Sequence, residues 1–368
     1  MKILSIGTDK TALDVGSVVN QRQVEYYKNF ESAVVVLLVS GQPKEFSVNN
    51  VSFKTYGGSS RLICFFRTYF GLRKRILKNK YDLTYSQDVL YCGLLGLIFK
   101  KLYKIKLVSQ LHGDYIDNPL WINQRVENRL LNIVAKNIIK NSDYIRAVSQ
   151  RIVEYYVNYL DVDKNIIKSL PIGIDGDIFN TKDLPSERKK QIVFVGRLMS
   201  EKEPHFFCDI VIPILHKHAD FKAVIIGDGP LKSELEKRFA EENLLDRAIF
   251  PGFLKFPEIA KYYKESFIFL HTAFWEGWGL PMVESTACGL PNVTTDTGCA
   301  GEVIIHEENG IIVKTKNKQD YIDAIVDLIN DPVKYKKLVE NCLKSGDEWT
   351  FAAMREKIEK FLIHAKEN

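Results

Sequence analysis

The stretch His271-Thr-Ala-Phe-Trp-Glu-Gly-Trp-Gly-Leu-Pro-Met-Val-Glu-Ser-Thr-Ala-Cys-Gly-Leu-Pro291 contains the most informative local signals in the chain. Proline suits the first helical position and glycine the position just past a helix end, so Pro281 and Gly289 predict a short helix between them. Gly277 and Gly279 lie in the loop before it, where a backbone without side chains lets amide groups approach a polar ligand. We therefore predict a ligand site formed by this loop and helix.

Two carboxylates belong to the same site. Glu276 opens the loop, and Glu284 is expected in the first helical turn, where a negative charge is favoured. Two carboxylates with free amides between them suit a polyhydroxylated ligand. The plainer interpretation is that Glu284 only stabilises the helix and Glu276 is solvated, and the spacing by itself does not decide between the two.

A second signal is Phe194-Val-Gly-Arg-Leu-Met-Ser-Glu-Lys-Glu-Pro204. Gly196 and Arg197 leave a predicted strand, and Lys202 precedes a helix predicted to open at Pro204. Two cations beside a helix N-terminus form a site for a diphosphate. The alternative is that both are ordinary surface charges, more so for Lys202 than for Arg197.

Around these stretches, short apolar runs alternate with helical segments, as parallel α/β proteins require. Strands are predicted at Lys2–Ile6, Ala33–Val39, Leu83–Ser86, Lys106–Gln110, Tyr144–Val148, Gln191–Val195, Lys222–Ile226, Ala248–Pro251, Phe267–Leu270, Asn292–Thr294 and Gly310–Val313. A helix is predicted near Val18–Phe30. The segment Ser169–Pro185 is rich in Gly, Pro and Asp and reads as a linker between two similar halves.

Composition agrees with two soluble domains: the chain has 368 residues, of which 46% are apolar and 26% charged. The six cysteines, far apart and without a C-x-x-C pair, indicate a reducing compartment rather than disulfides or zinc. The N-terminus Met1–Asp9 reaches a charge too early for a signal peptide, and the apolar run Tyr91–Phe99 is too short to span a membrane. We expect a cytoplasmic protein.

Positive charge is concentrated in one region. The segment Phe46–Gly113 has twelve Lys and Arg against two Asp, whereas the whole chain has a net charge of only +5. Within it, Arg61–Lys78 mixes basic and large apolar residues at helical spacing. Two interpretations stay open for residues 61–80, a peripheral contact with an anionic membrane and a core helix with a solvated basic face. No nucleic-acid motif accompanies the patch, so we expect no nucleic-acid partner.

The order and spacing of these motifs resemble family 4 glycosyltransferases of the GT-B fold. The resemblance rests on Gly196-Arg197 with Lys202, Ile226-Gly-Asp-Gly-Pro230, Glu276 to Glu284, Gly289-Leu-Pro291, Asn309-Gly310 and Trp349, and more weakly on Leu111-His-Gly113 and Ala147-Val-Ser149. It implies an α/β protein of two Rossmann-like domains facing across a cleft, with a final helix crossing back to the first domain. The implied division is 1–170 for the acceptor side, 171–348 for the nucleotide-sugar side and 349–368 for the returning helix.

The family also implies a role for each matching residue. Arg197 and Lys202 would bind the donor diphosphate and stabilise the leaving group, and Glu284 would hold the ribose. Glu276 and the amides of Gly277, Trp278, Gly279 and Leu280 would hold the sugar, and His112 would face the sugar and diphosphate from the other domain. Glu276 as a nucleophile is the alternative to Glu276 as a binding group, and the sequence does not decide between them.

This chain departs from the family pattern at several places. The first loop, Asp14-Val-Gly-Ser17, has only Gly16 where paired glycines are usual, and Glu203 replaces the glycine that commonly follows the lysine. The two D-x-D patterns, Asp161-Val-Asp163 and Asp175-Gly-Asp177, do not follow a nucleotide-binding strand. We read both as solvated turns and expect no metal and no cofactor besides the donor substrate.

The resemblance implies a retaining, metal-independent glycosyltransferase. It would move a hexose or N-acetylhexosamine from a UDP- or GDP-sugar to a glycan or lipid-linked glycan, in cell-surface polysaccharide or glycoconjugate synthesis. Two alternatives are another GT-B enzyme, such as a sugar-nucleotide epimerase or a phosphorylase, and a non-catalytic GT-B partner subunit. The four intact residues Arg197, Lys202, Glu276 and Glu284 argue against the second.

Overall fold

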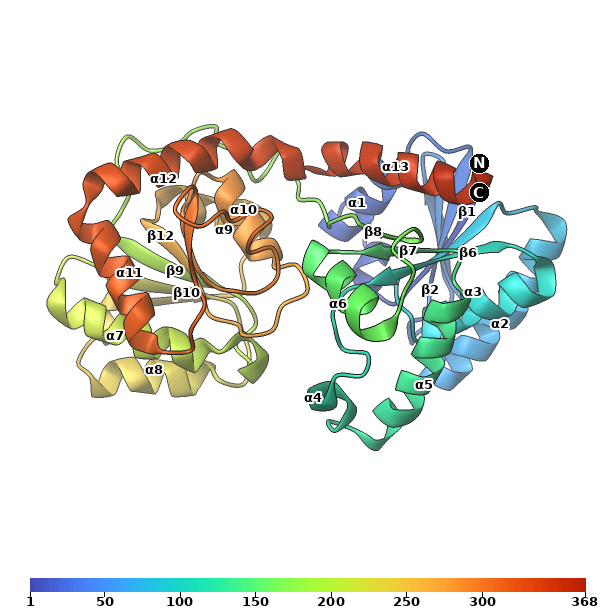
Figure 1. The fold of residues 1–368 in the computed structure, drawn as a ribbon, viewed down its shortest axis with the longest axis horizontal. Coiled ribbons are helices and arrows are strands. Elements are labelled where there is room, and N and C mark those ends of the chain that lie inside the picture. Colours follow the sequence, from blue (N-terminus) through green and yellow to red (C-terminus); the bar gives the residue numbers. More distant parts are fainter. The chain divides into compact units, whose positions relative to one another are not determined.

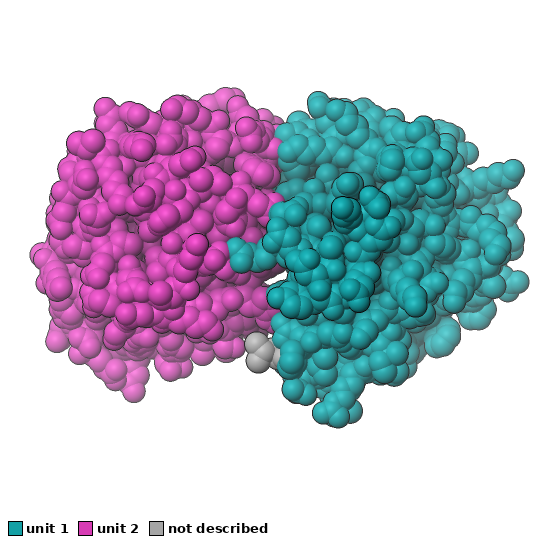
Figure 2. Space-filling view, in the orientation of Figure 1, with its two compact units in different colours: residues 1–173, 351–368 teal, residues 174–350 magenta. Residues whose placement is uncertain are grey.

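The computed structural model describes residues 1–368, apart from the side chain of Leu120. The chain divides into two compact units, coloured separately in Figure 2. Unit 1 comprises Met1–Gly173 together with Phe351–Asn368, and unit 2 comprises Ile174–Thr350. Each unit has its own sheet, covered by its own helices (Figure 1).

Unit 1 is built on an eight-stranded sheet in the order β3-β4-β2-β1-β5-β6-β7-β8. All neighbouring strands run parallel except β3, which pairs antiparallel with β4 at one edge. Its elements are β1 (Lys2–Gly7), the 3-10 turn η1 (Lys10–Leu13), α1 (Val18–Tyr27), β2 (Ser32–Leu37), β3 (Lys44–Val48), β4 (Val51–Thr55), α2 (Arg61–Lys78), β5 (Leu83–Ser86), α3 (Tyr91–Tyr103), β6 (Lys106–Leu111), α4 (Pro119–Ile122), α5 (Val126–Asn141), β7 (Tyr144–Ala147), α6 (Gln150–Leu160), β8 (Ile167–Ser169) and α13 (Phe351–Glu367).

Unit 2 is built on a six-stranded, fully parallel sheet in the order β11-β10-β9-β12-β13-β14. This is the doubly wound order in which the chain first builds outward in one direction and then returns to build in the other. Its elements are β9 (Gln191–Val195), η2 (Ser200–Lys202), α7 (Pro204–Lys217), β10 (Lys222–Ile226), α8 (Lys232–Glu241), η3 (Leu245–Arg247), β11 (Ala248–Gly252), α9 (Phe256–Glu265), β12 (Ile268–His271), α10 (Leu280–Ala287), β13 (Asn292–Thr295), β14 (Gly310–Val313), α11 (Lys318–Asn330), α12 (Pro332–Ser345) and η4 (Gly346–Trp349).

The strands read from the sequence are all present, and three others are not foreseen by it. These are the β3–β4 hairpin and the short strand β8. Strand β3 is largely exposed at the sheet edge, and β4 alternates buried and half-buried residues, so neither shows the continuous apolar run of a covered strand. The predicted first helix also ends earlier, at Tyr27 rather than Phe30.

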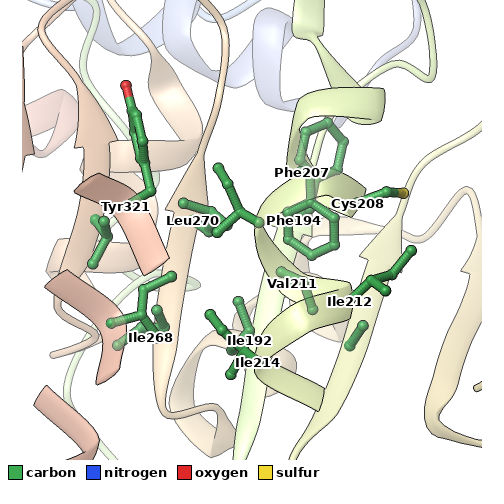
Figure 3. Close-up of a cluster of buried hydrophobic side chains, with 14 of the residues drawn as sticks. Ile192, Phe194, Phe207, Cys208, Val211, Ile212, Ile214, Ile268, Leu270 and Tyr321 are labelled. Carbon is green, nitrogen blue, oxygen red and sulfur yellow. The ribbon is translucent and has the colours of Figure 1, made fainter. Parts of the chain in front are cut away.

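The core of unit 2 shows why its strands are so apolar. Phe194 of β9 packs edge-on against Phe207 of α7, with ring centroids 5.4 Å apart, and Leu270 of β12 lies in the same buried cluster (Figure 3). Helices cover both faces of this sheet, so each strand buries side chains in both directions. The rigid sheet fixes the positions of the loops that follow its strands.

The last helix, α13, belongs to unit 1 although unit 2 precedes it in the chain. It packs along α1, where Phe351 meets Tyr26 edge-on at 6.3 Å and Arg355 forms an ion pair with Glu25. Met354, Ile358 and Leu362 are fully buried on its inner face. The returning final helix expected from the family resemblance is therefore observed.

Arg188 joins the ends of two helices in unit 2. Its guanidinium group donates to carbonyl oxygens at the end of α9 and just past the end of α10, at 2.9–3.2 Å; the acceptors are Tyr263, Lys264, Ser266, Cys288 and Gly289. The last carbonyls of a helix have no partner within the helix, and a cation at that end is favoured by the helix dipole. Arg188 therefore anchors the far end of the helix that begins at the predicted ligand loop.

We expect Arg188→Met to destabilise unit 2 by about 2 kcal/mol, because it leaves carbonyl groups at two helix ends without their donor. Thermal unfolding followed by circular dichroism measures the effect. Lys190→Met is the matched control, since Lys190 is exposed and, among the described residues, pairs only with exposed Asp220. Equal unfolding temperatures for the two variants would show that Arg188 does not stabilise the helix ends.

Candidate active site

The predicted site residues of unit 2 lie at the carboxyl ends of neighbouring strands. Strands β9 and β12 are adjacent in the sheet, and they mark the point where the strand order reverses. In doubly wound sheets, loops on either side of this point diverge and leave a crevice for a ligand. Gly196 and Arg197 follow β9 and the Glu276 loop follows β12, so the fold places both sequence motifs at this point.

The β9 loop depends on close backbone packing. A Cβ atom at Gly227 would lie 1.9 Å from the carbonyl oxygen of Gly196, and one at Gly229 would lie 2.4 Å from that of Leu198. Only glycine fits at such distances, which explains the Ile226-Gly-Asp-Gly-Pro230 motif. The packed loop leaves the side chain of Arg197 largely exposed, where it pairs with Glu201 at 3.0 Å.

Glu203 keeps the turn that glycine makes in the family pattern. It adopts the left-handed conformation, with φ 49° and ψ 47°, directly before α7. The conformation is unfavourable for a residue with a side chain and costs on the order of 1 kcal/mol. Thr272, after β12, donates to the carbonyl oxygens of Lys202 and Glu203 at 3.1 Å each and so holds this turn in place.

The loop before α10 ends in a second left-handed position, and here the residue is glycine, which adopts this conformation without strain. Gly279 has φ 85° and caps the helix, and a Cβ atom there would lie 2.3 Å from Met282 Cε. Gly289 follows the helix end with φ 72°, as predicted. Two details of the prediction are wrong: the helix begins at Leu280, so Pro281 is its second residue, and Glu284 lies in the second turn.

Glu276 and Lys202 form a partly buried ion pair that links the β12 and β9 loops. His271 Nε2 lies 3.9 Å from the same carboxylate oxygen, and the Glu276 amide donates to Thr297 Oγ1 at 3.0 Å. Burial raises the pKa of Glu276, but the adjacent His271 and Lys202 outweigh it and lower the pKa to about 2. Glu276 is therefore a fixed negative charge at any physiological pH.

Glu284 has the opposite electrostatic character. Its side chain is buried, and the one hydrogen bond it accepts from a described side chain is a long one of 3.5 Å from the hydroxyl of Tyr263. Burial raises its pKa to about 8, and the bond from Tyr263 lowers it only partly. A ligand that donates hydroxyl groups to Glu284 would supply the hydrogen bonds that its ionised form lacks.

Several residues of this site were not foreseen from the sequence. His271, Tyr263, Thr272 and Thr297 each contact one of the predicted residues. His271 stands at the end of a predicted strand within the quoted stretch, so its position was available as a signal. Tyr263 lies on α9, and nothing in its local sequence connects it to Glu284.

The predicted residues of unit 1 lie at the corresponding edge of the other sheet. Gly16 has φ 83° and precedes Ser17, the capping residue of α1. His112 directly follows β6 and is exposed. The surrounding protein and the guanidinium groups of Arg146 and Arg22 lower the pKa of His112, so its ring is neutral near pH 7.

The two D-x-D patterns lie in turns. Asp161 is the left-handed residue that ends α6, and Asp163 accepts hydrogen bonds from Asn165. Asp175 accepts from the backbone of Asp177. Within the residues that the structure describes, no group of three or more His, Cys, Asp or Glu is arranged to hold a metal ion.

Comparison with known proteins identifies the family of this chain. Residues 177–345 match the family model of glycosyl transferases group 1, and residues 26–177 match that of glycosyltransferase family 4. The chain belongs to the family 4 glycosyltransferases. An uncharacterized glycosyltransferase of Methanocaldococcus jannaschii is 30% identical over 72% of this chain and 70% of its own length.

Two further relatives have more descriptive names. The UDP-Gal:α-D-GlcNAc-diphosphoundecaprenol α-1,3-galactosyltransferase of Escherichia coli is 26% identical over 73% of this chain and 71% of its own length. The crystal structure of Anabaena HepE in complex with UDP superposes with a TM-score of 0.77, covering 99% of this chain and 100% of that one at 20% identity. The glycosyltransferase therefore has the GT-B fold, as the family resemblance implied.

The glycosyltransferase should lose stability as pH rises because of Glu284. Between pH 4.5 and about 8 the folded chain holds a proton that the unfolded chain has released, so the free energy of unfolding falls as pH rises through this window. Glu284→Gln removes the titrating group. We expect its melting temperature, relative to wild type, to increase steadily from pH 5 to pH 8.

Glu340→Gln serves as the control, because Glu340 is an exposed carboxylate on α12 of the same unit. Its melting temperature should follow wild type at every pH. A constant difference between Glu284→Gln and wild type across the window would mean that Glu284 is not protonated in the folded state at neutral pH.

Proposed function

We propose that the chain is a retaining, metal-independent glycosyltransferase that transfers a hexose or N-acetylhexosamine from a UDP- or GDP-sugar. The acceptor is a glycan or lipid-linked glycan in cell-surface polysaccharide or glycoconjugate synthesis on the cytoplasmic side of the membrane. The observation that carries the proposal is the ion pair of Lys202 with Glu276 beside the loop that precedes α10. It brings a cation suited to a diphosphate next to a carboxylate suited to sugar hydroxyls.

Each end of a nucleotide sugar has a matching group in unit 2. Arg197, exposed and paired only with Glu201 among the described residues, is available to a diphosphate together with Lys202. Buried Glu284 receives the ribose hydroxyls, which lower its pKa. Glu276 and the backbone from Gly277 to Leu280 hold the transferred sugar. UDP is favoured by the similarity to HepE, whose crystal structure is a complex with UDP, and to the galactosyltransferase that uses UDP-galactose.

In the proposed reaction the bond between the anomeric carbon and the diphosphate oxygen breaks while an acceptor hydroxyl attacks from the same face. The hydroxyl proton passes to the departing phosphate oxygen, so no protein nucleophile is required. Arg197 and Lys202 stabilise the negative charge that grows on the leaving group. Gly16 and His112 of unit 1 are the further donor contacts proposed from the family, and His112 acts there as a neutral hydrogen-bonding group.

Nucleotide release from UDP- and GDP-sugars with a glycan acceptor tests the proposal. We expect Arg197→Ala and Glu284→Ala each to lower kcat/KM by about 100-fold, because each removes a charged or buried contact to the donor. Lys189→Ala, which removes an exposed cation of the same unit, should retain the wild-type rate. Wild-type rates in both site variants would refute the assignment.

The same assay separates the alternatives. An epimerase would change the free nucleotide sugar without an acceptor, and a phosphorylase would require inorganic phosphate. A partner subunit would bind donor but turn it over only after mixing with a second protein. Full activity after treatment with EDTA is the outcome expected for the metal-independent reaction.

We propose further that unit 1 docks on an anionic membrane through the outer faces of α2, α3 and α5, where α3 lies between the other two (Figure 1). This docking surface holds nine of the seventeen large apolar side chains that are exposed among the described residues. They are Leu62, Ile63, Phe66, Phe70 and Leu77 of α2, Leu102 of α3, and Val126, Leu130 and Ile133 of α5. A core helix with a solvated basic face would expose polar residues here instead of two phenylalanines.

Charge on the docking surface favours a lipid occupant over a second protein. Helix α2 contains six Lys and Arg and no acidic residue. Arg67, Arg73 and Lys74 are exposed and form no ion pair with any described residue. Apolar side chains flanked by unpaired cations match the boundary between anionic headgroups and acyl chains. No helix in the described part of the chain is long and apolar enough to cross a membrane.

Vesicle co-sedimentation tests the membrane contact. We expect the protein to bind vesicles that contain phosphatidylglycerol and to bind phosphatidylcholine vesicles weakly. Replacing Phe66 and Phe70 together by Ser should weaken binding about tenfold, because it removes two large apolar groups from the lipid. The matched control replaces Leu245 and Phe253 of unit 2, also exposed, by Ser. Equal binding of the two double variants would place the contact elsewhere.

A further inference from the structure

Unit 1 contains a small polar pocket at the carboxyl ends of its own strands. Its volume is about 40 Å³, and its walls come from α1, β7 and the ends of β5 and β6. Six of its lining residues matter for its chemistry, namely Arg22, Gln23, Tyr85, Gln110, His112 and Arg146. This space accommodates a single small group, such as a carboxylate or a phosphate, and not a sugar ring.

Arg146, on β7, is a buried cation whose bonded partners are all neutral. Its guanidinium group donates to the carbonyl oxygens of Leu170 and Pro171 at 2.6 Å each. It also donates to the hydroxyl of Tyr85 at 3.1 Å and to the amide oxygen of Gln110 at 3.0 Å. No described carboxylate pairs with it, although its side chain is only 3% exposed. A buried charge without a counter-ion is costly unless a ligand supplies one.

Arg22, on α1, adds a second cation to the same pocket. Its side chain is half-buried and makes no hydrogen bond or ion pair with any described residue. Burial lowers the pKa of Arg22, and the charge of Arg146 lowers it further. Two guanidinium groups that repel one another across one small space favour an anion between them.

The remaining groups agree with a ligand that also bears a hydroxyl. Asp9 attracts Arg22 electrostatically but forms no ion pair with it, and the Oδ1 atom of Asp9 accepts two hydrogen bonds from Thr11. The Oε1 atom of Gln23, whose side chain is 7% exposed, has no hydrogen-bond partner. A hydroxyl next to the anionic group would donate to it.

We propose that this Arg22–Arg146 pocket binds the anionic group of the acceptor, a carboxylate or phosphate on the sugar or carrier that receives the transferred residue. The identification of the ligand as an acceptor rests on the proposed transferase function. The anion site itself does not depend on that function. The pocket selects acceptors that carry a negative charge near a free hydroxyl. Neutral glycans of the same size bind it poorly.

Binding of inorganic phosphate, glucuronate and glucose to the full chain tests the pocket directly, by isothermal titration calorimetry. We expect both anions to bind and glucose not to bind. Arg22→Met should weaken anion binding at least about tenfold, since one ion contact is lost. Because Arg22 forms no bond with any described side chain, its loss should not lower the melting temperature. Lys28→Met, which removes an exposed cation from the end of the same helix, should bind both anions like wild type.

The relative affinities for phosphate, glucuronate and UDP distinguish a phosphorylated acceptor, an acidic sugar and the donor phosphates as ligands of the pocket. Stronger binding of phosphate indicates a phosphorylated acceptor, and stronger binding of glucuronate an acidic sugar. Titration with UDP should give the same affinity in Arg22→Met and wild type within about twofold. A parallel loss of UDP affinity would mean that donor phosphates occupy the pocket, and would overturn the proposal.

Failure of both anions to bind wild type would also overturn the proposal, as would wild-type affinity in Arg22→Met. Measuring nucleotide release from the donor in the same samples distinguishes failure of the pocket from failure of the proposed transferase function. Absent anion binding with normal release refutes the pocket alone. Anion binding with no release refutes the transferase assignment and leaves the pocket in place.

Discussion

The parallel direction of the strands is the constraint on which the functional parts of this molecule depend. Every strand of the unit 2 sheet, and every strand but β3 in unit 1, ends at the same edge of its sheet. Loops that are far apart in sequence are thereby brought together without any contact needing to specify it. In unit 2 the constraint places Lys202, after β9, against Glu276, after β12.

The two units differ in the charged residues that lie at this edge of the sheet. In unit 2 the cation Lys202 faces the carboxylate Glu276, so the site is internally compensated before any ligand arrives. In unit 1 Arg146 donates only to neutral groups among the described residues, and Arg22 beside it forms no ion pair with any of them. A compensated site binds a ligand by exchanging partners, whereas an uncompensated one binds by supplying the missing charge. The second kind discriminates more strongly between charged and neutral ligands.

Most of the fold was predictable from the sequence. Parallel strands covered by helices on both faces form apolar runs, and helices bounded by proline and glycine have recognisable ends. Helix α10 was bounded by Pro281 and Gly289, and β9 and β12 by their apolar runs. The β3–β4 hairpin escaped because an exposed edge strand needs no apolar run. Glu284 was placed one turn too early, since the helix begins one residue before Pro281.

The candidate site was predictable only where a motif lies within one segment. The cations after β9 and the carboxylates around α10 were visible in sequence, but their pairing depends on strand order, which local patterns do not encode. Tyr263 beside Glu284 and Arg22 beside Arg146 come from separate elements. The burial that raises the pKa of Glu284 is a property of the packed unit, so no residue type alone predicts it.

The pairing of Lys202 with Glu276 also sets a condition on any ligand of unit 2. A diphosphate that draws Lys202 away leaves the partly buried Glu276 carboxylate with His271 as its one basic partner among the described residues, which raises the free energy of the complex. A ligand that adds sugar hydroxyls beside the diphosphate replaces the lost bond to Glu276. For the donor proposed above, this arrangement would favour the intact nucleotide sugar over the free nucleotide, and it would weaken binding once the sugar has been transferred.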